Sequence, residues 1–237
     1  MGAVERRCGA AGRGDPGGGV AIAALLTLAA ALAVILLIRA QMGGQRRQVY
    51  IAKPLATILL LATALLVRSP VSQTYQLLIA GGLLCSLAGD VCLMLPQEQA
   101  GFDWFLAGMV SFFAAHLLYI AAFVTRNGWN AEPFLLLLWV SFGIGYTALL
   151  WPYLGRLRLP VLAYIGAILL MAWQAIGGWQ RAPSSGTAAA ALGAISFVLS
   201  DSALAWDRFR RRFTAAPVVV LGSYYLAQGL LAWSVAG

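Results

Sequence analysis

Long apolar runs separated by short polar connections occupy almost the whole chain beyond residue 19. A helix that crosses a bilayer needs about 20 mainly apolar residues, and several runs reach that length. None of them alternates strictly between apolar and polar positions, as a half-buried strand would. The pattern therefore predicts an all-α, polytopic membrane bundle of eight transmembrane helices at 20–38, 50–67, 76–95, 104–124, 133–151, 159–179, 186–206 and 216–236.

The domain organisation follows from the same pattern. Residues 1–19 are rich in Gly and Arg, and we expect them to form a disordered tail. The connections between the runs are short, so residues 20–237 should form a single membrane domain. Of the 237 residues, 61% are hydrophobic and 10% are charged. Soluble domains are roughly 45–50% apolar and about 25% charged, so composition supports the membrane interpretation.

The net charge of +8 is explained by the membrane, without a nucleic-acid partner. Its basic residues adjoin the ends of the runs and are unevenly divided between the two sides of an eight-span chain. The side with both termini carries Arg6, Arg7, Arg13, Arg68, Arg126 and Arg181, and the other carries Arg39, Arg46, Arg47, Lys53, Arg156, Arg158, Arg208, Arg210, Arg211 and Arg212. The positive-inside rule then places the richer side in the cytoplasm and both termini outside.

The third and seventh runs share a spacing of Gly and Asp. The segment "GLLCSLAGD" ends at Asp90, and "GAISFVLSD" ends at Asp201. The same offset pairs the fourth run with the eighth and Lys53 with Tyr164. The repetition predicts a 4+4 internal duplication with parallel copies. Chance similarity between two helices rich in Ala, Leu and Gly is the alternative.

Ionisable residues inside the runs are the candidates for chemistry, because each costs roughly 2.5–3.5 kcal/mol on insertion scales and is usually kept for function. Asp90 and Asp201 each lie near the end of an odd-numbered run. With a rise of 1.5 Å per residue, both should lie roughly 8 Å below the same membrane surface. Lys53 starts an even-numbered run and reaches that surface too. We therefore expect the polar groups to converge at the Arg-rich side.

The fourth and eighth runs add polar side chains to this set. His116 is the only histidine, and it shares a helical face with Phe112 and Tyr119. By the same spacing, Tyr224 and Gln228 share a face. The alternative is a structural role for these residues. Lys53 can form an ion pair with an aspartate that holds the bundle together, and His116 can form an interhelical hydrogen bond with a Ser or Tyr. The cysteines Cys8, Cys85 and Cys92 are expected to pack as small apolar residues, so we predict no metal and no cofactor.

Two carboxyl groups at one depth suit acid–base work. Desolvation favours the neutral form, and a neighbouring carboxylate separates the pair into an acid and a base. Such a pair can protonate a substrate and stabilise a nearby oxocarbenium ion. The chain has no GxSxG, HExxH, CxxC-pair or Walker motif, which argues against a serine lipase, a zinc protease and nucleotide chemistry. Acid–base hydrolysis of a lipid and proton-coupled transport remain.

Several segments closely resemble the YhhN-like family, whose animal members include lysoplasmalogenases. They are "KP" at Lys53–Pro54, "GDVCLMLP", "FLAGMVSFFAAHLLYIAAF", "AYIGAILLMA", "GAISFVLSDSALAWDRF" and "YYLAQ". The resemblance extends over about residues 50 to 232. It implies hydrolysis of the vinyl-ether bond of lysoplasmalogens to a fatty aldehyde and glycerophosphocholine or glycerophosphoethanolamine. It also implies a lysophospholipid partner in the bilayer of the bacterial inner membrane or the eukaryotic endoplasmic reticulum.

The resemblance also suggests roles for individual residues. One of Asp90 and Asp201 would be the acid and the other the base or cation stabiliser, with His116 as the third catalytic residue. The substrate-binding residues would be Lys53, Tyr119, Tyr164, Ser200, Tyr224 and Gln228. Lys53 would face the phosphate, and the active site would lie towards the cytoplasmic face. The alternatives are a proton-coupled transporter, a lipid-binding membrane protein that uses the same Asp and His residues, and a purely structural scaffold.

Overall fold

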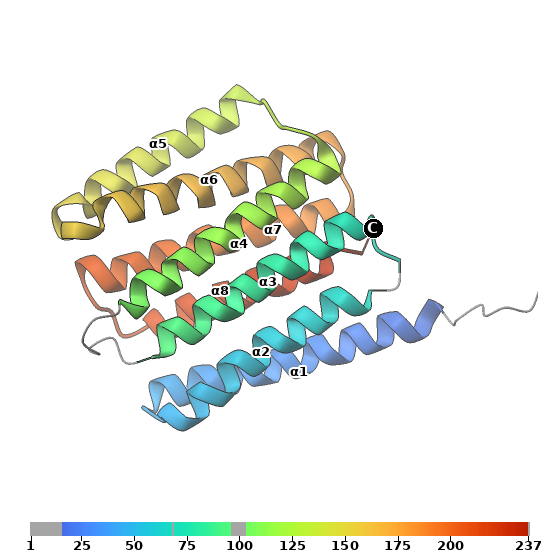
Figure 1. Cartoon of the computed structure of the whole chain (residues 1–237), viewed down its shortest axis with the longest axis horizontal. Coiled ribbons are helices and arrows are strands. Elements are labelled where there is room, and N and C mark those ends of the chain that lie inside the picture. The colour runs from blue at the N-terminus through green and yellow to red at the C-terminus, as the bar shows by residue number, and fades with distance from the viewer. Residues whose placement is uncertain (1–15, 68, 96–102, 237) are drawn as a thin grey trace, which may run out of the picture.

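The computed structural model describes residues 16–67, 69–95 and 103–236 and shows a bundle of helices that run alternately up and down (Figure 1). In this part of the chain, eight helices are long and apolar enough to cross a membrane, which confirms the eight-span prediction. They are α1 (Pro16–Met42), α2 (Arg46–Leu66), α3 (Gln73–Met94), α4 (Trp104–Asn127), α5 (Pro133–Leu150), α6 (Arg158–Arg181), α7 (Ser185–Ala205) and α8 (Ala216–Trp233). The chain is an integral membrane protein.

Two segments of the sequence-based interpretation differ from the structure in extent. The helix α1 begins at Pro16, inside the segment 1–19 expected to be a disordered tail. Residues 1–15, with Cys8, Arg6, Arg7 and Arg13, lie outside the described residues, as does Arg68. Beyond the end of α7, residues Trp206–Arg210 form a π-helical turn, η3, that the apolar pattern did not predict.

The helices form an elongated array (Figure 1). The pair α1 and α2 lies at one edge and α5 at the opposite edge, with α3, α4, α6, α7 and α8 between them. Connections 43–45, 151–157 and 206–215 lie at one end of the bundle, and connections 128–132 and 182–184 lie at the other, with the C-terminus. The first end holds the Arg-rich segments and is called the basic end below. This arrangement matches the division of basic residues between the two membrane sides that the sequence predicted.

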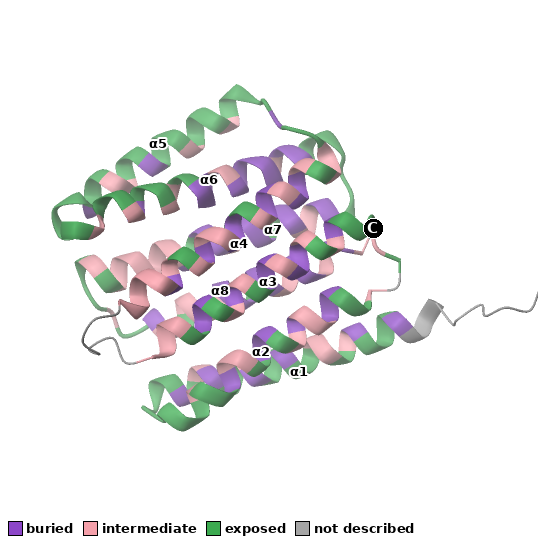
Figure 2. Cartoon of the chain, viewed as in Figure 1, coloured by how far each residue is buried: buried purple, intermediate pink, exposed green. Residues whose placement is uncertain are grey.

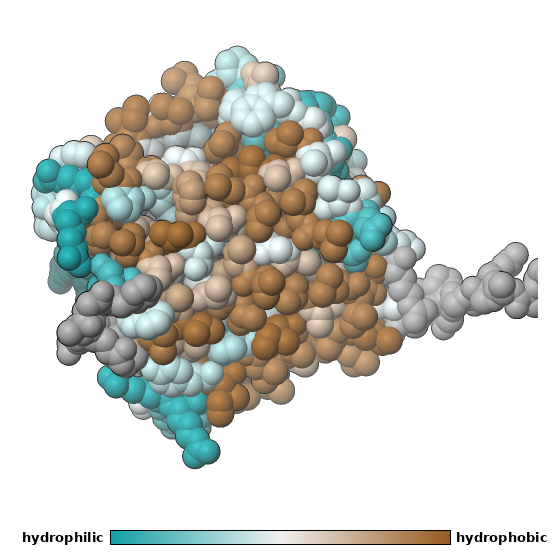
Figure 3. Space-filling model, in the orientation of Figure 1, coloured by the Kyte–Doolittle hydropathy of each residue, from teal (hydrophilic) through white to brown (hydrophobic). Residues whose placement is uncertain are grey.

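Burial is greatest along the middle of the array (Figure 2). By contrast, α5 has only two buried residues, Gly143 and Leu150. The visible face of the molecule is apolar across its middle and polar towards the two ends (Figure 3). That distribution is expected for helices whose outer surfaces contact lipid tails while the ends reach the head groups.

Local sequence signals explain where several helices start. Ser72 caps α3 and Asp103 caps α4, each by accepting a hydrogen bond from a backbone N–H in the first turn. Ser184 and Thr187 form a capping box at the start of α7. Pro133 opens α5, where the missing N–H costs nothing. These caps fix the helix starts at both ends of the bundle.

Glycines in α3 set the position of α4. A Cβ atom on Gly82 would lie 2.2 Å from the Tyr119 ring, and one on Gly89 would lie 2.6 Å from the Phe112 ring. Only a residue without a side chain allows the rings of α4 to lie this close to the α3 backbone. The "GLLCSLAGD" segment therefore has a packing role, because its two glycines hold the aromatic face of α4 against α3.

Candidate functional site

The first polar cluster surrounds Asp90 on α3, which is 1% exposed. Its Oδ1 lies 3.1 Å from Nζ of Lys53, so the two side chains form an ion pair. Its Oδ2 accepts hydrogen bonds from the hydroxyls of Tyr224, at 2.8 Å, and Thr57, at 2.9 Å. The Tyr225 hydroxyl donates to the backbone carbonyl of Lys53 at 2.9 Å. The cluster thus ties α2, α3 and α8 together.

The Asp90 carboxyl therefore has a full set of partners. A lysine ammonium contacts one of its oxygens, and two hydroxyl donors contact the other. None of Asp90, Lys53 and Tyr224 lines the apolar cavity of the described structure that Asp201 lines. The sequence left open whether Lys53 pairs with an aspartate to hold the bundle, and this geometry fits that structural role.

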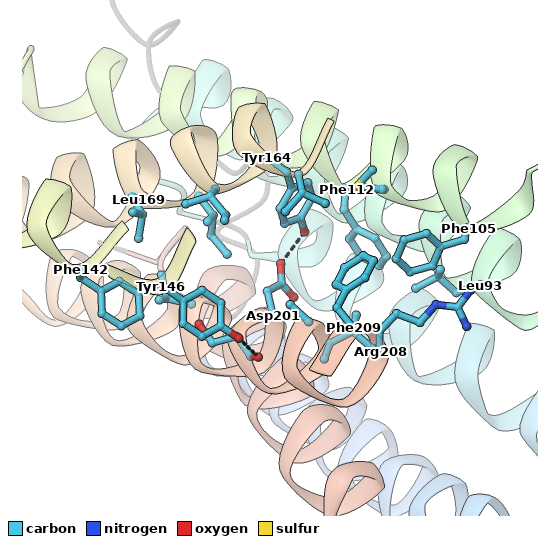
Figure 4. A pocket seen from close by; sticks show the side chains of 18 residues that line it. Leu93, Phe105, Phe112, Phe142, Tyr146, Tyr164, Leu169, Asp201, Arg208 and Phe209 are labelled. Carbon is cyan, nitrogen blue, oxygen red and sulfur yellow. Dashed lines mark hydrogen bonds between the residues drawn. The ribbon is translucent and has the colours of Figure 1, made fainter. Parts of the chain in front are cut away.

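The second polar cluster surrounds Asp201 on α7, at the wall of a cavity lined by residues of α3, α4, α5, α6, α7 and η3 (Figure 4). The cavity has an empty volume of about 720 Å³, including its open side. Its wall is mainly apolar and aromatic, with Phe105, Phe112 and Phe142 among its members. Asp201 is the only carboxylic acid among the described residues that line it. Its carboxyl therefore faces a space that a lipid chain suits.

Asp201 has a different set of partners from Asp90. The hydroxyl of Tyr164, on α6, donates a hydrogen bond to Oδ2 of Asp201 (Figure 4). Within the described ranges, no cationic side chain forms an ion pair with Asp201. In the described structure its side-chain donor is a tyrosine, whereas Asp90 has a lysine and two hydroxyls. The two aspartates are thus chemically unequal.

A row of aromatic rings separates the two aspartates. The Tyr224 ring, next to Asp90, lies 5.5 Å from the Phe197 ring, and Phe197 lies 4.9 Å from the His116 ring. His116 in turn lies 5.2 Å from the ring of Tyr164, which binds Asp201. All these pairs meet edge to face, an arrangement that packed aromatic side chains favour. The two carboxyls lie at opposite ends of this row and share no hydrogen-bond partner in the described structure.

Four of the predicted site residues lie behind the cavity wall. His116 is fully buried, and neither ring nitrogen has a hydrogen-bond partner among the described residues. Tyr119 donates to Oε1 of Gln228 at 2.9 Å, which joins α4 to α8. Ser200 donates to the backbone carbonyl of Val220 at 3.0 Å. None of the four lines the cavity, although the His116 ring contacts that of Tyr164, which does.

Sequence reasoning did not single out three polar residues at the cavity, Tyr146, Ser202 and Arg208, and it considered Arg208 only as one of the basic residues beside a span end. Arg208, in the π-helical turn, is exposed and lines the cavity, and its guanidinium lies 4.8 Å from the centre of the Phe105 ring. Tyr146 lines the cavity from α5 and donates to the backbone carbonyl of Ser202. The spacing of seven between Asp201 and Arg208 was a usable signal, because it places both on one helical face. Tyr146 had no such signal.

The duplication remains a prediction, although one feature of the two clusters agrees with it. The sequence offset paired Lys53 with Tyr164 and Asp90 with Asp201. In the structure, Lys53 contacts Asp90 and Tyr164 contacts Asp201, so equivalent positions make equivalent contacts. Elsewhere, no group of three His, Cys, Asp or Glu side chains in the described ranges could hold a metal ion.

Comparison with known proteins places both clusters within one family. Residues 48–235 match the YhhN family, a range that includes both aspartates and every predicted site residue. The chain belongs to the YhhN family. The resemblance seen in the sequence is thereby confirmed. Helix α1 lies outside the matched YhhN range, which agrees with its place at the edge of the bundle.

Named relatives fall into a bacterial and an animal group. The uncharacterized membrane protein YhhN of Escherichia coli is 29% identical over 174 residues, or 73% of this chain and 80% of that protein. Lysoplasmalogenase TMEM86B of Sus scrofa is 39% identical over 129 residues, and that of Homo sapiens is 38% identical over 146 residues. These matches cover 54% and 61% of this chain but only 50% and 56% of the animal proteins. No solved structure matches the chain.

Proposed function

We propose that this YhhN-family protein is a membrane hydrolase that cleaves the vinyl-ether bond of lysoplasmalogens, with Asp201 as its general acid. The observation that carries the proposal is a single carboxyl group, bonded to a tyrosine hydroxyl and without a cation, in the wall of an apolar cavity near the basic end. The similarity to animal lysoplasmalogenases names the substrate class. A lysoplasmalogen combines an alkenyl chain with a head group that carries an anionic phosphate, and the cavity offers an apolar wall and an arginine.

The first step of the reaction is a proton transfer to carbon. Asp201 in its acid form donates its proton to the terminal enol carbon of the vinyl ether, whose double-bond electrons form the new C–H bond. The ether-bearing carbon becomes an oxocarbenium ion, and Asp201 becomes a carboxylate beside it. An anion beside a developing cation stabilises the transition state. The Tyr164 hydroxyl orients the carboxyl and keeps a hydrogen bond to it in both forms.

The second step adds water and restores the acid. A water oxygen attacks the cationic carbon, and the Asp201 carboxylate takes the proton that the water loses. The resulting hemiacetal transfers its hydroxyl proton to the ether oxygen as the C–O bond breaks, which gives a fatty aldehyde and the glycerophospho-alcohol. One carboxyl group thus serves as acid and then as base, and Asp90 is not required as a reacting group. His116 supports Tyr164 through their ring contact.

Arg208 is our choice for the phosphate of the head group, in place of Lys53. Lys53 is paired with Asp90 and does not line the cavity. Arg208 follows Asp201 by seven residues, which corresponds to about 10 Å along a helix towards the basic end. The glycerol backbone of a lysophospholipid can bridge such a separation, with the flexible arginine side chain covering the remainder. The proposal thus orients the substrate with its phosphate at the basic end.

The assay that tests the function measures fatty aldehyde released by the purified protein in lipid nanodiscs. We expect aldehyde from lysoplasmenylcholine or lysoplasmenylethanolamine and none from the matched alkyl lysophospholipid, which has no vinyl ether. Substrate-dependent proton flux in liposomes without aldehyde would instead favour the transporter. The cavity favours the hydrolase, because the polar residues among the described ones that line it lie towards the basic end and the rest of its lining is apolar. The assignment of that end to the cytoplasm stays a prediction.

The phosphate assignment gives a separate prediction. In Arg208→Gln we expect KM for lysoplasmenylcholine to rise about tenfold, the effect of losing roughly 1.4 kcal/mol of charge-assisted binding, with little change in kcat. Arg212→Gln is the matched control, because Arg212 is exposed nearby and does not line the cavity. Steady-state aldehyde release gives both constants. An equal rise of KM in both variants would mean that the positive charge of the whole surface attracts the substrate and that Arg208 does not bind its phosphate specifically.

A further inference from the structure

The apolar part of the cavity beyond Asp201 is short. Val198 lies one turn deeper than Asp201 on α7, and Ile168 and Leu169 lie about one turn deeper than Tyr164 on α6. One turn of helix advances the chain by about 5.4 Å. Half of the hydrocarbon core of a bilayer is about 15 Å thick, and lipid tails are matched to that depth. A full tail extended from Asp201 into the bilayer therefore reaches beyond the residues that line the cavity.

The side towards α6 is closed. Leu169 lines the cavity and presses against α5 at Gly143, where an added Cβ atom would lie 2.6 Å from Cδ1 of Leu169. This contact packs α5 closely against α6, its main neighbour, at the level of Leu169. The tail must leave elsewhere.

The side towards α7 is open to the surroundings of the bundle. Phe142 lines the cavity from α5 and is nevertheless 41% exposed, so the wall is incomplete at this position. In Figure 4, Phe142 and Tyr146 lie on the side of Asp201 away from Arg208 and Phe209. The Phe142 and Tyr146 rings stack 5.7 Å apart, and the Tyr146 hydroxyl bonds to the carbonyl of Ser202 on α7. Tyr146 thus closes the seam between α5 and α7 on the basic-end side of Phe142.

We propose that the hydrocarbon chain of the substrate leaves the cavity sideways into the bilayer through the seam between α5 and α7, past Phe142. The proposal rests on the proposed function for the identity of the lipid. The reacting carbon lies at Asp201, the first methylenes lie against Leu169 and Val198, and the rest of the chain stays among the lipid tails. The substrate then enters from the membrane without leaving it completely. Tyr146, by its bond to Ser202, is the residue that must yield when the glycerol end passes.

The opening between α5 and α7 at Phe142, called the portal below, predicts how activity depends on the length of the substrate chain and on the size of the side chain at this opening. Phe142→Trp should obstruct the seam and lower kcat/KM about tenfold for a hexadecenyl substrate, a typical effect of a misfit in an apolar site. A butenyl substrate, which fits within the cavity, should be unaffected. Ile144→Trp is the matched control, since Ile144 is 66% exposed on the same helix and does not line the cavity. It should leave both substrates unchanged. An equal loss for both substrates in Phe142→Trp, or no loss for either, overturns the portal.

A measurement without turnover separates this proposal from the proposed function. A non-hydrolysable alkyl lysophosphocholine carrying a diazirine at its chain end is photolysed with the protein in nanodiscs, with and without an excess of the unlabelled lipid. We expect labelling at Leu138 and Leu199, and the excess of unlabelled lipid should abolish it. These residues lie one turn deeper than Phe142 and Ser202, respectively, and each is 55% exposed. Labels confined to Leu169 and Val198 would place the chain end inside the cavity and refute the portal. Absence of aldehyde from the wild type refutes the hydrolase and leaves the labelling result standing.

Discussion

Replacing Asp201 by Asn should lower kcat for vinyl-ether cleavage by about 10²–10⁴-fold, the usual contribution of a positioned general acid. The loss corresponds to roughly 3–5 kcal/mol of transition-state stabilisation. The asparagine keeps the shape of the side chain and can still accept the hydrogen bond from Tyr164, so the fold should persist. It has no acidic proton to give to carbon and no anion to leave beside the cation. Aldehyde release at saturating substrate measures the effect.

Two further variants make this result specific. Asp207→Asn is the matched control, because Asp207 also lies near the basic end but bonds to the backbone N–H of Phe213 and does not line the cavity. It should retain nearly wild-type kcat. Tyr164→Phe removes the hydroxyl that holds Asp201 and should lower kcat by less than the aspartate substitution does. If Asp201→Asn keeps most of its activity, the single-carboxyl mechanism is wrong.

Much of the fold could be predicted because the bilayer imposes it. A chain with long apolar runs and short connections can satisfy its backbone in lipid only by forming helices, and the alternation of direction then follows. This reasoning was enough to place Lys53, Asp90 and Asp201 at one end of the bundle. It could not give their partners. Periodicity fixes the depth of a residue and its helical face, whereas the neighbour that each face meets depends on how the helices pack.

The parts that sequence reasoning missed are those created by packing. The spacing of Asp90 and Asp201 is the same in two similar helices, which suggested a pair of equal carboxyls. Packing makes them unequal, because α2 supplies a lysine to one and α6 supplies a tyrosine to the other. The turn that brings Arg208 to the cavity is π-helical, and such turns have no simple sequence signature. Its presence beside Asp201 fits the frequent occurrence of π-turns at functional sites.

Breaking the ion pair between Lys53 and Asp90 should be the most destabilising single change in the polar clusters. Both side chains are mostly buried, with exposed fractions of 12% and 2%. Removing one partner leaves the other charge unpaired in a low-dielectric site, at a cost of about 3–5 kcal/mol. We therefore expect Lys53→Met and Asp90→Asn each to lower the free energy of unfolding by about this amount. Equilibrium unfolding in mixed micelles measures it.

The double variant separates a structural pair from a catalytic one. In Lys53→Met with Asp90→Asn, no charge is left unpaired, and the asparagine can still accept hydrogen bonds from Tyr224 and Thr57. The double variant should thus be more stable than either single variant, since the two changes are coupled. It should also keep vinyl-ether cleavage. A folded double variant that releases no aldehyde would instead show that Asp90 or Lys53 takes part in the reaction.

An exposed ion pair in the same molecule calibrates these values. Arg156 and Asp103 lie 3.0 Å apart near the basic end, with side chains 84% and 31% exposed. Water screens such a pair, so Arg156→Gln should cost only about 0–1 kcal/mol. A similar small cost for Lys53→Met would mean that water reaches Asp90 and that the cluster is not the anchor of α2, α3 and α8. A much larger loss of free energy of unfolding for Lys53→Met than for Arg156→Gln would assign a structural role to Asp90. Asp201 would then be the aspartate that acts in the chemistry.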